Sequence, residues 1–290
     1  MKKDLISYHD MLTQITFFEI WLQEHNITPK QNRLAELKTF LKQMDDSWRG
    51  GSRQIEDLKS KLGIEYMIFG LNEASALVEI IKFLSTYPPH NLPRQTIKDM
   101  LGGPFLPKDE ISGNETVHPR NRQFEIEVAA RLGNKGIRIK KFDDVQFDFE
   151  NKVFSIQCKR LISAGNIVQN IRKAHEQLRQ QFSRGNNHGI IALSIDKLID
   201  SDKNILAVDS VAEAESKLIS HMLNFVQEHA ESFNGLCGSE VMAVFIVARI
   251  VVDLNSGTRL NSYSQLFVVN LCEKNTENHS CMSRLLSKIS

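Results

Sequence analysis

Apolar residues in the N-terminal part of the chain recur three or four positions apart, which is the spacing of an amphipathic helix. Two such stripes are Met11, Ile15, Phe18 and Leu22, and then Leu34, Leu37, Leu41 and Met44. Thr28-Pro29 predicts the start of the second helix, and Gly50-Gly51 predicts its end. Asn72 is expected to cap a further helix that ends before Pro88-Pro89. The pattern predicts an all-helical N-terminal region over residues 1–115.

The hydrophobic pattern changes after the stretch from Gly102 to Pro119, which is rich in Gly, Pro, Asn and charge and has the composition of a linker. Beyond it, alternating or wholly apolar runs predict strands at 137–141, 145–149, 153–157, 189–195, 241–252 and 265–271. Helical spacing predicts helices at 122–132, 167–182 and 208–231. Residues 116–290 are therefore expected to form a second domain, of the α/β class.

Two of the predicted strands form a hairpin that gathers polar side chains. If Glu150-Asn151 is its two-residue turn, the numbers of paired residues sum to 301, and Asp144 then lies opposite Gln157. Residues i and i+2 of a strand share a face, so Lys159 projects beside Gln157. The same register places Asp148 near the turn, although a shift of one or two residues would leave Asp148 as the alternative to Asp144. A carboxylate, an amide oxygen and an ammonium group together are the components of a metal-and-water site.

The charge of the chain is concentrated around this hairpin. The whole chain carries a net charge of only +1, but residues 119–184 hold 14 Lys or Arg against 7 Asp or Glu, a local +7. A local basic excess suits a polyanionic ligand such as nucleic acid. No run approaches the ~18 apolar residues of a membrane helix. The cysteines form no CxxC pair, which favours reduced thiols in a cytoplasmic protein.

The segment from Asp143-Asp144 to Gln157-Cys158-Lys159-Arg160 resembles the core of the PD-(D/E)xK nuclease superfamily, in which an Asp opens the second strand and an (E/Q)xK motif lies on the third. The 13-residue spacing of Asp144 and Gln157 is similar to that of archaeal Holliday-junction resolvases, and Gln followed by Lys-Arg resembles the Mrr-type nucleases. Upstream, Glu125 matches the acidic residue of the first family helix, with Glu127 as the alternative. Asp143 replaces the family's Pro. The resemblance covers residues 119–196.

The resemblance implies a restriction-endonuclease-like mixed sheet flanked by helices and an Mg²⁺- or Mn²⁺-dependent DNA endonuclease. Asp144, the Gln157 side chain and Glu125 would ligate the metal, with the backbone carbonyl of Cys158 completing the shell. Lys159 would orient or activate the attacking water. The resemblance also suggests a role in restriction or anti-phage defence.

Further basic residues are candidates for contact with the DNA backbone: Arg160, Arg172, Lys173 and Arg179. The helical N-terminal region is a candidate surface for a second copy of the chain or for a partner protein. Because Gln157 is neutral where Glu is common, one alternative stays open. In it the chain is a nucleic-acid-binding or assembly subunit that keeps the nuclease fold without cleaving, or that cleaves only when a partner activates it.

Overall fold

The computed structural model describes residues 6–29, 33–106, 118–182, 188–199, 205–237, 240–254 and 260–289. The chain divides into two compact units, and neither is one continuous segment. The first unit holds Met1–Gln123, Asp200–Glu215 and Ile250–Tyr263; the second holds Phe124–Ile199, Ser216–Arg249 and Ser264–Ser290. Within the described ranges, no helix combines the length and the apolar composition that crossing a bilayer requires.

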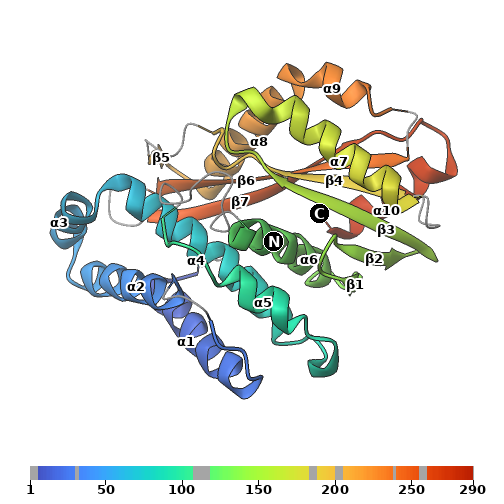
Figure 1. Ribbon diagram of the computed structural model, residues 1–290. Coiled ribbons are helices and arrows are strands. Elements are labelled where there is room, and N and C mark those ends of the chain that lie inside the picture. The colour runs from blue at the N-terminus through green and yellow to red at the C-terminus, as the bar shows by residue number, and fades with distance from the viewer. Residues whose placement is uncertain are drawn as a thin grey trace. The chain divides into compact units, whose positions relative to one another are not determined.

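The first unit is dominated by helices, as the N-terminal pattern predicts (Figure 1). They are α1 (Tyr8–Glu24), α2 (Arg33–Arg49), α3 (Ser52–Leu62), α4 (Ile64–Leu84), the 3-10 turn η1 (Pro89–Asn91) and α5 (Arg94–Met100). The apolar stripes that the sequence shows on α1 and α2 are buried. A reciprocal pair of hydrogen bonds between Ser7 and Asp10 caps α1. The predicted linker falls partly on residues 107–117, which lie outside the described residues. Thr28 and Pro29, the predicted start of the second helix, lie outside any helix, and α2 is described from Arg33 onward.

The expectation that Asn72 caps a helix is wrong. Helix α4 runs unbroken from Ile64 to Leu84, and Asn72 lies inside it. Gly63, with a φ of +84°, ends α3 and precedes α4, so the break falls nine residues before Asn72. The side chain of Asn72 accepts a hydrogen bond from Ser262 Oγ at 2.7 Å. Asparagine is a common helix cap, which is why the sequence predicted a local role for Asn72. Its observed hydrogen bond is instead to a residue 190 positions away.

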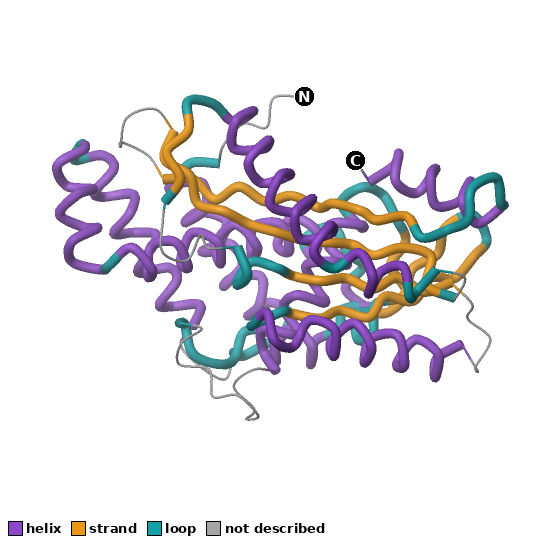
Figure 2. Tube along the Cα trace, turned by 90° about the horizontal axis from the view of Figure 1, so that it is seen from above, coloured by secondary structure: helices purple, strands orange, loops and turns teal. Residues whose placement is uncertain are grey.

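A mixed sheet follows, which confirms the α/β prediction (Figures 1 and 2). Its strand order is β1-β2-β3-β4-β6-β5, and β7 also pairs with β6. Strands β1, β2 and β3 are antiparallel, whereas β3, β4 and β6 are parallel, as are β5 and β6. The strands are β1 (Arg138–Lys141), β2 (Gln146–Phe149), β3 (Lys152–Arg160), β4 (His188–Ser194), β5 (Leu206–Val208), β6 (Val241–Leu254) and β7 (Leu260–Asn270).

The remaining helices are α6 (His118–Gly133), α7 (Ile167–Phe182), α8 (Val211–Glu228), α9 (Ala230–Asn234) and α10 (Glu277–Ile289), with a 3-10 turn η3 (Ala164–Asn166) before α7. The sequence predicted α6, α7 and α8 but not α5, α10 or the three-residue strand β5. Helix α7 packs against β3 and β4 through buried Ile171, Ala174, Leu178 and Phe182. Its exposed side faces away from the sheet (Figure 1).

The hairpin of β2 and β3 has the register that the sequence predicts. Gln146 pairs with Ser155 and Phe149 with Lys152, so paired numbers sum to 301. Glu150 and Asn151 have φ values of +49° and +61°, the left-handed conformation that both central residues of a tight hairpin turn of this kind adopt. Helix α10 is bonded to the hairpin tip, because Arg284 donates to both carboxylate oxygens of Glu150, at 2.5 and 2.6 Å.

Helix α7 approaches β4 closely at Gly189. A Cβ at this position would lie 2.6 Å from Phe182 Cζ and 3.3 Å from the carbonyl oxygen of Glu240. We expect Gly189→Ala to lower the free energy of unfolding by about 1–3 kcal/mol, the usual range for overpacking a core. Gly165→Ala is the matched control, because no heavy atom lies within 4 Å of its Cβ position. Urea denaturation of both variants measures the difference, and equal midpoints would contradict the packing.

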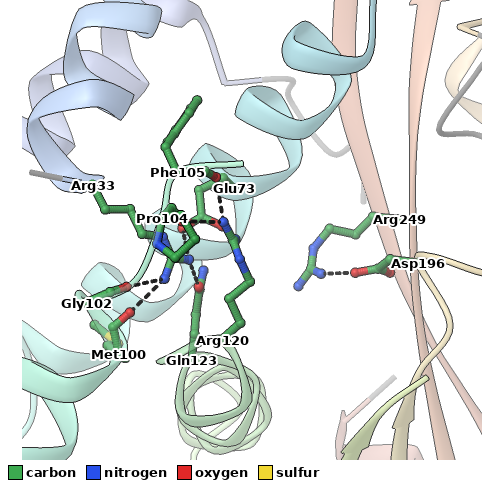
Figure 3. Close-up of polar contacts among 10 residues, drawn as sticks. All are labelled: Arg33, Glu73, Met100, Gly102, Pro104, Phe105, Arg120, Gln123, Asp196 and Arg249. Carbon is green, nitrogen blue, oxygen red and sulfur yellow. Dashed lines mark hydrogen bonds and ion pairs between the residues drawn. The ribbon is translucent and has the colours of Figure 1, made fainter. Parts of the chain in front are cut away.

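A buried ionic cluster lies in the first unit, centred on Glu73 of α4 (Figure 3). Arg33 of α2 and Arg120 of α6 both pair with its carboxylate, and Gln123 accepts a bond from Arg33. The two arginines also donate to backbone carbonyls of Met100, Gly102, Pro104 and Phe105. Burial would raise the pKa of Glu73, but the charges of Arg33 and Arg120 outweigh it and hold the pKa below its usual value. The cluster thus ties the chain at 100–105 to α2, α4 and the first turns of α6.

Candidate active site

Asp144 and Gln157 meet as the hairpin register predicts. Asp144 lies in the turn before β2, with a φ of +48°, an uncommon conformation that Asp tolerates better than most residues. Pairing continues past the end of β2, because Ile156 N–H donates to Val145 O at 2.7 Å. The Gln157 amide nitrogen then donates to Asp144 Oδ1 at 2.9 Å. Gln157 is only 3% exposed, so this bond satisfies a buried amide.

Lys159 lies two residues beyond Gln157 on the same face of β3. Its Nζ donates to Gln177 Oε1 of α7 at 2.6 Å, which places this face of the strand on the α7 side. Burial lowers the pKa of Lys159 below its usual value, although Cys158, Glu125 and Asp144 act in the opposite direction. The charges of both candidate carboxylates therefore favour the ammonium form of Lys159.

The geometry separates Asp144 from its alternative, Asp148. Asp148 pairs with Val153 in the hairpin, near the turn. Its carboxylate forms an ion pair with Lys140 of β1, at 3.3 Å. Asp144 is therefore the aspartate beside Gln157, and Asp148 lies toward the hairpin turn, where it pairs with β1.

Glu125 and Glu127 of α6 also have different surroundings. Glu125 is half-buried, and its charge acts on both Cys158 and Lys159. Glu127 is 2% exposed and pairs with Arg249 of β6 and with Arg131, the latter at 2.9 Å. Glu127 is thus committed to a buried ionic cluster, and Glu125 is the acidic residue near the candidate site.

The Glu127 cluster extends across the parallel strands. Arg249 also donates to Asp196, just beyond the end of β4, at 2.5 Å (Figure 3). Burial would raise the pKa of Glu127, but the charges of Arg249 and Arg131 prevail and lower it. The three charged residues on α6, β6 and the end of β4 therefore fix the second half of α6 against the sheet.

The lowered pKa of Glu127 predicts a pH dependence of stability. The folded-state pKa of Glu127 lies below 4.5, its usual value. The ionised carboxylate therefore contributes its full stability above pH 4.5, and this contribution is lost as the pH falls through the folded-state pKa. We expect Glu127→Gln to be less stable than the parent protein at neutral pH, with a difference that shrinks progressively below pH 4.5. Chemical denaturation over a series of pH values measures it, and a constant difference down to acid unfolding would contradict the assignment.

Cys158 lies between the two motif residues and faces the other side of β3. It is half-buried rather than part of the core. Burial, with the charge of Glu125, raises the pKa of its thiol, so the side chain stays a thiol near neutral pH and is a poor ligand. Only its backbone carbonyl remains a candidate donor to a cation.

The basic residues expected to contact DNA have two kinds of environment. Arg172, Lys173 and Arg179 are exposed on α7. Arg160, the last residue of β3, is half-buried. Its charge acts on Asp196, whose pKa burial raises above the usual value although Arg249 and Arg160 oppose the shift. These three and the exposed Glu176 among them form the outer surface of the helix that contacts Lys159, a basic face with a net charge of +2.

A pocket of about 300 Å³ adjoins Asp144 and Gln157. It is lined by Lys141, Asp144, Gln146, Gln157, Gln177, Gln180 and Gln181. Asp144 and Gln157 are the lining residues that the sequence predicted for the site, and the other five were missed. The spacing of the three α7 glutamines, at i, i+3 and i+4, was the available signal that they share one face.

The candidate ligands all offer oxygen atoms. Asp144 and Glu125 supply carboxylates, Gln157 an amide oxygen and Cys158 a backbone carbonyl, the oxygen ligands that Mg²⁺ and Mn²⁺ accept. Gln157 presents its nitrogen to Asp144, so ligation requires the amide to turn its oxygen toward the carboxylate side. Among the residues that the structure describes, no three His, Cys, Asp or Glu side chains gather closely enough to hold a metal by themselves. The amide and the carbonyl are therefore essential parts of this donor set.

No family model, no curated protein and no solved structure matches this chain. The interpretation of the site therefore rests on its own geometry and chemistry.

Proposed function

We propose that this protein is a metal-dependent DNA nuclease of the PD-(D/E)xK type, with a restriction-endonuclease-like core formed by α6, the β1–β3 strands, α7 and β4. One observation carries the proposal. The hairpin brings Asp144 to 2.9 Å from Gln157, with Lys159 on the same face of β3. Together with Glu125, these are the residue types that metal-assisted hydrolysis of a phosphodiester requires.

Each residue has a role that follows from its surroundings. Asp144, Glu125, the Gln157 amide oxygen and the Cys158 carbonyl would hold the cation, which would polarise the phosphoryl group and acidify a water when bound. Lys159, partly buried and bonded to the neutral Gln177, keeps its ammonium aimed at the site. It orients the attacking water and balances the charge that develops as the new P–O bond forms and the ester P–O bond breaks. The attacking water gives up its proton to solvent as it bonds to phosphorus, and the departing alkoxide takes a proton from solvent.

The exposed basic face of α7 supplies the substrate contacts in this proposal. Arg172, Lys173 and Arg179 would neutralise phosphates on either side of the cut, which gives affinity and salt dependence but little sequence preference. A role in restriction or anti-phage defence follows only from the resemblance of the motif.

Two aspartates of one hairpin provide a matched test. We expect Asp144→Asn to weaken Mn²⁺ binding, measured by titration calorimetry, by about 10–100-fold, and to remove DNA cleavage. Asp148→Asn should leave both unchanged, because Asp148 pairs with Lys140 away from the site. Equal behaviour of the two variants would refute the assignment of Asp144.

A second candidate has its own supporting observation. Gln157 is neutral and already satisfies Asp144 with its amide nitrogen, so this pair is stable without a cation. A subunit that binds nucleic acid without cutting it, or that cuts only after a partner rearranges this pair, fits the same geometry. Such a protein would bind DNA with the salt dependence of the α7 face, yet show neither Mn²⁺ binding nor cleavage by itself.

A further inference from the structure

The pocket beside Asp144 has an unusual lining for a nuclease site. Five of its seven lining residues are glutamines: Gln146, Gln157, Gln177, Gln180 and Gln181. The two others, Lys141 and Asp144, have opposite charges. The volume of about 300 Å³ lies at the lower end of the ~300–1,000 Å³ that small-ligand pockets occupy. The pocket is therefore large enough for a small ligand, and the charges of its lining cancel.

This lining discriminates between classes of ligand. A phosphate group is recognised by several Arg or Lys donors, and the pocket offers only Lys141. An amide, in contrast, carries donors and an acceptor on one planar group, which matches the polar edges of nucleobases. Neutral amides line the pocket from β2 and β3 and also from α7. They suit a flat, neutral ligand that carries both hydrogen-bond donors and acceptors.

One polar atom of the lining lacks a partner. The Oε1 of Gln181 is buried and accepts no hydrogen bond from the described residues. Leaving a buried acceptor unsatisfied costs about 1–3 kcal/mol. This oxygen is closed off from solvent, and a turn of the side chain that brought it to the pocket would let a ligand N–H remove that cost. Two other amides are already engaged, since Gln157 donates to Asp144 and Gln177 accepts from Lys159. Gln181 is thus the lining residue whose chemistry most directly calls for a ligand.

We propose that this pocket receives a nucleobase unstacked from the DNA, next to the phosphodiester that is cut. The inference rests on the proposed nuclease function, because Asp144 and Gln157 line the pocket and also belong to the candidate metal site. A nucleotide carries its base and phosphate on one sugar, so a base held by the glutamines places its own phosphate near Lys159. Unstacking is least costly for an unpaired base, and the protein therefore prefers DNA with a mismatch, bulge or single-stranded segment at the cut.

Binding measurements without cleavage test the pocket separately from catalysis. Wild-type protein, Gln181→Leu and the control Gln169→Leu, an exposed glutamine of the same helix, are titrated in EDTA with labelled duplexes. One duplex is fully paired and the other has a single 2-aminopurine opposite an abasic site. We expect wild type and Gln169→Leu to bind the second duplex about tenfold more tightly, and 2-aminopurine fluorescence to change on binding. Gln181→Leu should lose about fivefold to tenfold of this preference, the effect of one hydrogen bond.

The outcomes separate the two proposals. Equal affinity of the wild type for both duplexes, or an unchanged preference in Gln181→Leu, would show that the pocket is a water-filled crevice, and would leave the nuclease proposal standing. No binding of either duplex would overturn the nuclease proposal and the base pocket together. Should Gln181→Leu fail to fold, Gln146→Leu on the opposite wall provides the same comparison.

Discussion

Replacing Lys159 with Met should reduce the single-turnover rate of DNA cleavage by about 10²–10⁴-fold, the contribution of one positioned proton-transfer or charge-stabilising group. Lys159 shares a face of β3 with Gln157, the charges of Asp144 and Glu125 act on its ammonium, and Met keeps the length of its aliphatic stem. Mn²⁺ binding should change little, because Lys159 is not a ligand. Quenched-flow assays with labelled DNA measure the rate, and calorimetry measures the metal affinity.

The fold should tolerate this substitution. Burial lowers the pKa of Lys159, so its ammonium costs folding free energy at neutral pH and is not a source of stability. Met cannot donate the hydrogen bond that Lys159 gives to Gln177, and such a bond stabilises the fold by about 1 kcal/mol. Lys140→Met, in the exposed pair with Asp148, is the matched control and should cleave at the wild-type rate. A Lys159→Met protein that cleaves as fast as this control would remove Lys159 from the mechanism.

Glu73→Gln should lower the free energy of unfolding of the first unit by about 3–5 kcal/mol. The substitution keeps the size of the side chain but leaves two buried arginines, Arg33 and Arg120, without a counter-charge. Both guanidinium groups are nearly inaccessible to water, so solvent does not replace the missing carboxylate. The segment at 100–105, whose carbonyls these arginines hold, should become more accessible to amide exchange.

Glu65→Gln provides the control on the same helix. Glu65 is exposed in the first turn of α4, and its substitution should cost less than about 1 kcal/mol. Urea denaturation followed by circular dichroism measures both variants, with the slope of the transition checked because the chain has two units. A Glu73→Gln protein as stable as Glu65→Gln would show that the cluster contributes no net stability.

The features predicted correctly from sequence are those encoded by neighbouring residues. The register of β2 and β3 followed from one turn, Glu150-Asn151, and from the alternation of the two strands. That register alone placed Asp144 beside Gln157. Helix α7 likewise was predicted with its observed ends, because its apolar spacing is strong and uninterrupted.

The features that the sequence did not reveal depend on residues far apart in the chain. The partners of Glu73 lie 40 and 47 positions away, and no local pattern links them. Asn72 was assigned a local role, but its partner is 190 residues distant. The pocket is lined from β2, β3 and α7, and of its five glutamines only Gln157 was predicted from the sequence to belong to a site. The sequence favoured Glu125 through the resemblance and left Glu127 as the alternative. The ion pair of Glu127 with Arg249 of β6, which separates the two, could not be predicted from the sequence.

The central claim is that Asp144, Gln157 and Lys159 form a metal-dependent nuclease site. Its most direct test is cleavage of supercoiled, linear and single-stranded DNA by the wild-type protein, Asp144→Asn and Lys159→Met, side by side, with Mg²⁺, Mn²⁺ or EDTA. The predicted result is cleavage by the wild type with either metal, none in EDTA, none by Asp144→Asn, and only the strongly slowed cleavage given above by Lys159→Met. Equal degradation by all three proteins, or none by the wild type with either metal, would contradict the claim.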